Sequence, residues 1–186
     1  MRNLGTKTLE TSRLILRRFT TDDAEDVYRN WASDPEVTRF LTWPCHSSPE
    51  ASRAVLEQWA AQYADGDYFQ WAISLKETGH VIGSIAAVKI DMEIGSAEIG
   101  YCLSRSYWGQ GIMPEALIAV MQYLFCEVEI NRICACHDVN NPKSGRVMEK
   151  AGMKLEGILR QAGKNNQGIC DIVMRSALRR EWIPPK

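Results

Sequence analysis

The chain has 186 residues, of which 45% are hydrophobic and 24% charged, and its formal net charge is -1 at pH 7. This balance is typical of one globular domain, and the near-neutral charge argues against direct binding to nucleic acid or to a membrane surface. No apolar run approaches the roughly 20 residues that span a bilayer, and the opening MRNLGTKTLE lacks the apolar core of a secretory signal. We therefore expect a single domain over residues 1–186, located in the cytoplasm.

The N-terminal third of the chain predicts a strand followed by two helices. Residues 13–19, RLILRRF, have a short apolar centre between arginines and predict the opening strand. Residues 20–33 begin with capping and acidic side chains and carry apolar residues at helical spacing, which predicts a helix. Residues 34–50 contain three prolines and predict a loop or a short helix, and a second helix is expected from Ser48-Pro49-Glu50.

The rest of the chain predicts a meander, two more helices and a hairpin. Three alternating or apolar runs between Tyr68 and Ser104 predict antiparallel strands. A helix is expected over 112–127, a strand over 132–139 and a short helix over 141–152. The final segments form a hairpin around KNNQG. The order β-α-α-β-β-β-α-β-α-β-β predicts an α/β (α+β) fold, with a mixed, mostly antiparallel sheet of about seven strands flanked by helices.

The six cysteines indicate neither a disulfide framework nor a metal site. No C-x-x-C pair occurs, and no histidine stands at zinc-binding spacing from a cysteine. Cys134 and Cys136 point to the same face of a predicted strand. Two thiols alone are too few ligands for a metal site. We expect free, mostly buried thiols, because disulfides are rare in the cytosol.

A glycine turn, SYWGQGIMPEA at 106–116, precedes the third long predicted helix. Glycine accepts a positive φ and lets a ligand approach the backbone, and the first N–H groups of a helix attract anions. The turn has neither the lysine of a P-loop nor the third glycine of a dinucleotide fingerprint. On these residues alone, an anion site and a plain strand-to-helix turn both remain open.

Two further segments carry groups that suit chemistry. In AEIGYCL at 97–103, alternation places Glu98 and Cys102 on one face of the strand and Tyr101 on the other. Glu98 could act as a general base or pair with an arginine on a helix, and the sequence leaves both open. Nothing nearby in the sequence would activate Cys102 as a nucleophile. In NPKSGRVMEKAG, Asn141 is a good N-cap, whereas capping does not explain Ser144.

Taken in order, the segments AEIGYCLSRSYWGQGIMPEAL, NPKSGRVMEKAGMKLEG and DIVMRSALRREW resemble the GNAT superfamily of acetyl-CoA-dependent N-acetyltransferases. The resemblance covers nearly the whole chain. The chain is most similar to the RimJ/RimL-like branch, whose members acetylate α-amino groups of ribosomal proteins and related amines. The resemblance implies a GNAT-like sheet that splays between the fourth and fifth strands, acetyl-CoA or CoA as cosubstrate, no metal, and a monomer or homodimer.

The resemblance also implies where acetyl-CoA would bind. The pyrophosphate would lie against backbone N–H groups of the turn from Ser106 to Met113, and the pantetheine arm would pair with the strand at Tyr101 to Leu103. Asn141 and Ser144 match positions at the thiol end. The expected cofactor-binding residues are Tyr101, Cys102, Leu103, Ser106, Trp108, Gly109, Gln110, Gly111, Ile112, Met113, Asn141 and Ser144.

For catalysis, Glu98 is the expected base and Ser144 the expected acid. Many members of the family carry a tyrosine where Met148 stands, and a Gln or Arg where Ser106 stands. Trp31, Trp43 and Glu98 are expected to bind the acceptor, although core packing is the other interpretation of both tryptophans.

The acceptor is expected to be a primary amine, first of all a protein N-terminal α-amino group such as that of a ribosomal protein. A small-molecule amine (a polyamine, an amino acid or a drug) and a CoA-binding sensor without turnover are the alternatives. No nucleic acid or membrane partner is expected.

Overall fold

In the computed structural model, which describes residues 2–185, eight strands form a mixed sheet in the order β1-β2-β3-β4-β5-β6-β8-β7. Among these strands only β5 and β6 pair in parallel. The strands are β1 (Leu9–Glu10), β2 (Leu14–Arg17), β3 (Gln70–Leu75), β4 (Val81–Asp91), β5 (Ser96–Leu103), β6 (Arg132–Asp138), β7 (Lys154–Asn165) and β8 (Gly168–Leu178). The predicted fold class is confirmed. The additional strand is β1, whose two residues are too short for a pattern.

The described residues form five α-helices: α1 (Ala24–Val27), α2 (Pro35–Thr38), α3 (Pro49–Gln62), α4 (Ile112–Tyr123) and α5 (Pro142–Lys150). The helix predicted over 20–33 is interrupted, since a 3-10 turn precedes α1 and a π turn follows it. A π turn also ends the helix predicted over 112–127. Both α3 and α5 begin as the sequence predicts, with a side-chain cap at Ser48 or Asn141 followed by proline.

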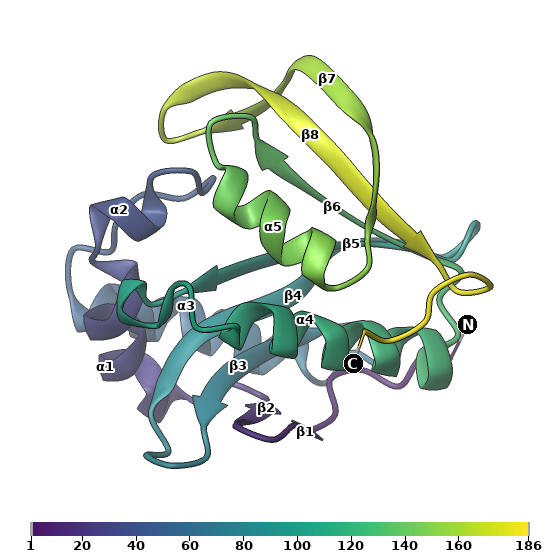
Figure 1. Cartoon of the computed structure of the whole chain (residues 1–186). Coiled ribbons are helices and arrows are strands. Elements are labelled where there is room, and N and C mark those ends of the chain that lie inside the picture. The colour runs from purple at the N-terminus through teal and green to yellow at the C-terminus, as the bar shows by residue number, and fades with distance from the viewer. Residues whose placement is uncertain (1, 186) are drawn as a thin grey trace.

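The sheet carries a helical layer on each face (Figure 1). Along β3, Trp71 and Ile73 belong to the core shared with α4 and α5, whereas Ala72 between them packs with the core of α1 and α3. Successive side chains of a strand point to opposite faces, so one strand supplies both layers. The larger core lies under α4 and α5.

The sheet opens between β5 and β6. These strands pair only at their first residues, Ser96 with Arg132, Ala97 with Ile133 and Glu98 with Cys134. β5 then continues to Leu103 along β4, and β6 continues to Asp138 along β8, without further pairing between them. The splay implied between the fourth and fifth predicted strands is therefore confirmed, and it begins directly after Glu98.

The cysteines within the described residues are all free. The prediction that they are mostly buried is wrong. Cys45, in the loop before α3, and Cys126, in the π turn after α4, are exposed, and the other four are half-buried. The exposed pair lies in segments outside the strands, where sequence alternation gives no guide to burial.

An ion pair crosses β8 to join the strands on either side of it. Arg132 on β6 donates two hydrogen bonds to the Glu156 carboxylate on β7, at 2.6 and 2.7 Å, and Ser176 on β8 donates a third at 2.6 Å. The hydrogen bonds from Arg132, and then that from Ser176, lower the pKa of Glu156 from its ordinary 4.5 to about 2. The carboxylate thus ties three strands together while it is ionised.

We expect Glu156→Gln to lower the free energy of unfolding at pH 7 by on the order of 1 kcal/mol. The loss is small because the carboxylate is 40% exposed and solvent screens its charge. Because the folded-state pKa is depressed, this stabilisation is present above pH 4.5 and is lost as the pH falls toward 2. Urea unfolding at several pH values measures the difference. Glu181→Gln, which removes the exposed pair with Lys154, is the control. A loss independent of pH would contradict this role of Glu156.

Candidate active site

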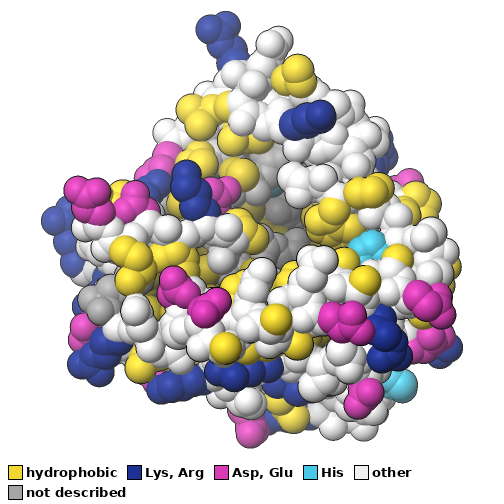
Figure 2. All heavy atoms as spheres, turned by 180° about the vertical axis from the view of Figure 1, so that it is seen from behind, with side chains coloured by type: hydrophobic (Ala, Val, Ile, Leu, Met, Phe, Trp, Pro, Cys, Tyr) yellow, Lys and Arg dark blue, Asp and Glu magenta, His cyan; other side chains and the backbone are white. Residues whose placement is uncertain are grey.

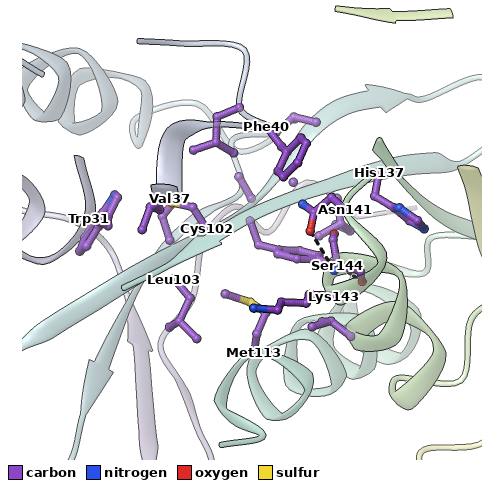
Figure 3. A pocket seen from close by; sticks show the side chains of 18 of the residues that line it. Trp31, Val37, Phe40, Cys102, Leu103, Met113, His137, Asn141, Lys143 and Ser144 are labelled. Carbon is purple, nitrogen blue, oxygen red and sulfur yellow. Dashed lines mark hydrogen bonds between the residues drawn. The ribbon is translucent and has the colours of Figure 1, made fainter. Parts of the chain in front are cut away.

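A cleft of about 1540 Å³ passes through the opening between β5 and β6. It is walled by the segment from α1 to α3 on one side, by the turn before α4 and by α5 on the other, and by β5 itself. Figure 3 shows Trp31 and Val37 on one side of β5 and Asn141, Ser144 and Met113 on the other. From the back of the molecule a hollow is visible with hydrophobic side chains around its rim (Figure 2). Both faces of the sheet therefore reach one continuous space.

The glycine turn has the backbone conformation that the sequence predicts. Gly109 and Gly111 have φ angles of +79° and +77°, which L side chains rarely adopt, and α4 starts directly after Gly111. Among residues 2–185, the N–H groups of Gly109, Gln110 and Gly111 have no hydrogen-bond partner. Nothing lies within 4 Å of a Cβ built on Gly109. The turn therefore offers unpaired N–H groups at the positive end of a helix, in open space.

Most of the residues expected to bind the cofactor reach this cleft. They are Tyr101, Cys102, Leu103, Trp108, Gly109, Gly111, Ile112, Met113, Asn141 and Ser144. The structure does not place Ser106 and Gln110 among the lining residues. Gln110 instead donates from Nε2 to the Ser106 carbonyl at 2.8 Å, so the two residues close the turn on its outer side.

Ser144 is held by Tyr101. The Tyr101 hydroxyl donates to the Ser144 carbonyl at 3.0 Å and lies 3.0 Å from the Ser144 Oγ, and the Asn141 side chain accepts from the Ser144 N–H. Burial raises the pKa of Tyr101, so the phenol stays protonated. Met148 is 1% exposed, belongs to the core under α5 and does not line the cleft. The hydroxyl groups of Ser144 and Tyr101 thus lie together at the start of α5, and both can donate a proton.

Glu98 lies half-buried in the cleft on the opposite face of β5 from Tyr101. Its side chain accepts from the Cys136 thiol at 3.5 Å. Within the described residues Glu98 forms no ion pair, so the interpretation of Glu98 as the partner of a helix arginine is wrong. Burial, and then the charge of Glu98, raise the pKa of Cys136 to about 12, which keeps this thiol a hydrogen-bond donor.

Cys102 is poorly suited to carry an acetyl group. Burial raises the pKa of its thiol to about 12, so the thiolate is scarce at neutral pH. A thiol with this pKa is a weak nucleophile unless a base lies beside it. The raised pKa therefore argues against an acetyl group carried on Cys102.

The acceptor side of the cleft includes both predicted tryptophans. Trp31 is only 2% exposed and packs in the core of α1 and α3, so the interpretation as a core residue applies to it as well. Trp43 is half-buried, and its ring centroid is 5.3 Å from that of His46. Both line the cleft, together with Phe40 between them in sequence (Figure 3).

Asn166, at the tip of the β7–β8 hairpin, holds the loop that carries Trp43. Its Nδ2 donates to the carbonyls of Thr38 and Trp43, both at 2.8 Å, and its N–H donates to the Leu41 carbonyl at 3.1 Å. The hairpin tip and the loop thus form one wall over the acceptor side. Asn166 is not among the site residues predicted from the sequence.

A row of basic side chains on α5 was not predicted from the sequence. Lys143, Arg146 and Lys150 lie on α5 and line the cleft, and the Lys143 ammonium lies 5.1 Å from the centre of the Trp108 ring. Their spacing of three and four residues places them on one side of the helix. This spacing was a signal in the sequence that could have found them. Lys143, through its contact with Trp108, brings positive charge next to the glycine turn.

Comparison with known proteins decides the family. A model of the "Acetyltransferase (GNAT) domain" matches residues 13–154. The chain belongs to the GNAT acetyltransferase family. It is 34% identical over 176 residues to the "Uncharacterized N-acetyltransferase p20" of Bacillus licheniformis, covering 95% of this chain and 98% of that protein. It is also 32% identical to a "Ribosomal-protein-serine acetyltransferase" of Escherichia coli K12, covering 73% of this chain and 75% of the relative.

Solved structures agree with the GNAT assignment. An acetyltransferase of the GNAT family from Bacillus anthracis superposes with a TM-score of 0.83 at 26% identity, covering 94% of this chain and all of that one. In residues 2–185 of this GNAT protein, no group of three or more His, Cys, Asp or Glu side chains could hold a metal ion. Of the helices in the same residues, none is long and apolar enough to cross a membrane.

We expect Asn166→Ala to loosen the loop at residues 39–47. The side-chain hydrogen bonds to the carbonyls of Thr38, at the end of α2, and of Trp43, in the loop, are lost, which should make the amides of this loop exchange with deuterium roughly tenfold faster. Hydrogen–deuterium exchange with mass spectrometry measures this. Gln167→Ala is the matched control, since within the described chain its side chain makes no hydrogen bond to residues 38–43. Equal exchange in both variants would refute the role of Asn166.

Proposed function

We propose that this GNAT enzyme transfers the acetyl group of acetyl-CoA to a primary amine by direct attack, and that its preferred acceptor is a protein N-terminal α-amino group. The observation that carries the proposal is the continuous cleft. One end presents backbone N–H groups without a partner among residues 2–185, with Lys143 nearby, and Glu98 lies farther along the cleft without an ion pair to any described residue. An anionic donor and a cationic acceptor would thus meet at the splayed strands.

The donor end suits a pyrophosphate. Three unpartnered N–H groups at Gly109, Gln110 and Gly111 stand at the N-terminus of α4, and a Cβ at Gly109 would meet open space. This combination is a general anion site. The basic side chains of α5 line the same cleft and would add charge for the phosphates. The lack of a P-loop lysine fits this role, because these phosphates are held and not transferred.

The edge of β5 that faces the opening suits the pantetheine arm. Beyond Glu98, β5 is paired only with β4, so the edge toward β6 has no partner strand. An extended amide chain can pair with such an edge as an added strand. Backbone N–H groups near Cys102 or Leu103 would then polarise the thioester carbonyl.

Glu98 is assigned the role of general base. It would remove a proton from the acceptor ammonium, directly or through a water, and the neutral amine would attack the carbonyl carbon. The new C–N bond forms, and the attacking nitrogen loses its second proton to solvent water. The C–S bond breaks, and its electron pair leaves on sulfur as a thiolate. An α-amino group with a pKa of about 7.7–8.0 is partly neutral at pH 7, whereas a lysine near 10.4 is not. Deprotonation therefore demands less of the base for an α-amino acceptor than for a lysine side chain.

Ser144 is assigned the role of general acid, which protonates the leaving thiolate. Its Oγ carries a proton and is held by Tyr101 and by the start of α5, which would let it donate to sulfur. The demand is modest, because a thiol pKa near 8.5 makes a thiolate a tolerable leaving group. Met148 has no proton to give and is buried away from the cleft.

The α-amino acceptor is supported by the Escherichia coli relative, whose name states a ribosomal-protein-serine substrate. A second candidate is a small cationic amine such as a polyamine. The carboxylates of Glu36, Glu98 and Asp138 all line the cleft and would favour multiple positive charges. A protein N-terminus would contact more of the cleft than a small amine would.

The test is release of free thiol from acetyl-CoA with a panel of acceptors. The panel contains peptides with free N-termini, the same peptides with blocked N-termini and an internal lysine, and polyamines. Turnover of free N-termini at least tenfold above the others supports the proposal. Preference for polyamines would select the second candidate, and CoA binding without release for any amine would leave only a sensor.

We expect Glu98→Gln to lower kcat by about a hundredfold or more at pH 7. The deficit should shrink as the pH rises past the pKa of the acceptor amine, near 8, because the amine is then neutral without a base. Steady-state rates from pH 6 to 9.5 measure this. Glu127→Gln, which removes an exposed surface pair with Lys7, is the control. An unchanged rate and pH profile in Glu98→Gln would remove Glu98 as the base.

A further inference from the structure

Arg13 connects three segments at the back of the glycine turn. Its Nη1 donates to the Gln110 carbonyl at 3.0 Å, and its Nε donates to the Glu115 carboxylate at 2.7 Å. Its Nη2 lies 2.6 Å from the same carboxylate, and its own backbone N–H donates to Glu115 at 3.0 Å. One guanidinium therefore joins the start of β2, the glycine turn and the first turn of α4.

The bond to Gln110 sets the direction of the next N–H group. In a planar trans peptide the carbonyl and the N–H point in opposite directions. With the Gln110 carbonyl held by Arg13 on one side, the N–H of Gly111 must point to the other. Gly111 lines the cleft, and its N–H has no protein partner among residues 2–185. A Cβ built on Gly111 would lie 3.5 Å from Arg13 Nη2, so the guanidinium packs directly behind this residue.

Arg13 also offsets a negative charge that would otherwise oppose an anion. Glu115 lies in the first turn of α4, and its side chain is 17% exposed. Burial by itself raises the pKa of Glu115, but hydrogen bonds from Thr11 and Arg13 outweigh it and lower the pKa below its ordinary value. The group is therefore ionised at neutral pH. A carboxylate at a helix N-terminus occupies the same favourable potential that a phosphate would use.

We infer that Arg13 is a positioning residue for the donor site, which aims the Gly111 N–H at the phosphates and neutralises Glu115 beside them. The inference rests on the proposed use of acetyl-CoA. Arg13 itself does not line the cleft and is not assigned a contact with the donor. Its effect passes through the turn, so it acts on the phosphate-bearing part of the donor and not on the acetyl group.

The discriminating experiment compares two donors. Acetyl-CoA carries the pyrophosphate, whereas S-acetylpantetheine has the same thioester and pantetheine arm without it. For each enzyme variant, kcat and KM are measured with both donors, and the dissociation constant of CoA is measured by calorimetry. For Arg13→Ala we expect KM for acetyl-CoA and the dissociation constant of CoA to rise about tenfold, the loss typical of one charge-assisted hydrogen bond. The values of kcat at saturation, and kcat/KM for S-acetylpantetheine, should stay within about twofold.

Two further variants keep the test decisive. Arg13→Lys retains the charge but not the forked geometry and should show an intermediate rise, which also guards against a variant that fails to fold. Arg17→Ala is the matched control, because Arg17 is the last residue of β2 and Arg13 immediately precedes this strand. Arg17 makes a two-bond pair with Asp23, at 2.7 and 2.8 Å, and does not line the cleft. Arg17→Ala should lower the melting temperature without changing the ratio between the two donors.

Each outcome decides one question. Equal losses with both donors in Arg13→Ala, or the same donor ratio in Arg13→Ala and Arg17→Ala, would overturn the positioning role and leave a purely structural one. A wild-type enzyme that neither binds CoA nor turns over acetyl-CoA would overturn the proposed function first, and the inference with it. A normal wild type with a donor-specific loss in Arg13→Ala supports both.

Discussion

The structure depends on one departure from regular pairing, the separation of β5 from β6 after Glu98. Their three paired residues hold the sheet together, and the unpaired remainder opens a passage between its two faces. Because side chains alternate along β5, Tyr101 points to the side of α4 and α5 while Glu98 and Cys102 point to the side of α1 to α3. A continuous ladder would have separated these groups by a closed sheet. The opening places them along one cleft.

Charge is distributed along this cleft in a way that fits its two ends. The unpaired N–H groups of the glycine turn and the basic row on α5 make one end attractive to anions. The Glu98 carboxylate lies farther along the cleft, and within residues 2–185 it accepts a hydrogen bond from the Cys136 thiol and forms no ion pair. A GNAT acetyltransferase must bring a polyanionic donor to an amine that arrives as a cation. The glycine turn and Glu98 are different groups along one passage, so a donor and an acceptor could bind without competing for them.

The walls of the cleft are held from outside by side chains that do not themselves face it. Arg13 and Glu115 hold the glycine turn against the start of β2, and Asn166 holds the loop of Trp43 against the β7–β8 hairpin. Such contacts order short loops that have little core of their own. Met148 is another side chain that lies behind the cleft and does not line it. It fills the core under α5, and the proton-bearing hydroxyl of Ser144 stands in the cleft instead.

The sequence by itself determined most of the longer strands and helices, the left-handed glycine turn before α4, the faces of β5 and the cap of α5, because each depends on backbone preferences or alternation within a few residues. It misjudged the exposure of Cys45 and Cys126, which lie outside the regular alternation. Only the tertiary structure decided that Glu98 lacks an arginine partner among the described residues, that Arg13 holds Gln110 and that Asn166 holds Thr38. These pairs are separated by 97 and 128 residues respectively, and no local pattern encodes which carbonyl a distant side chain will reach. That choice is made by the packing of the sheet and its helices as a whole.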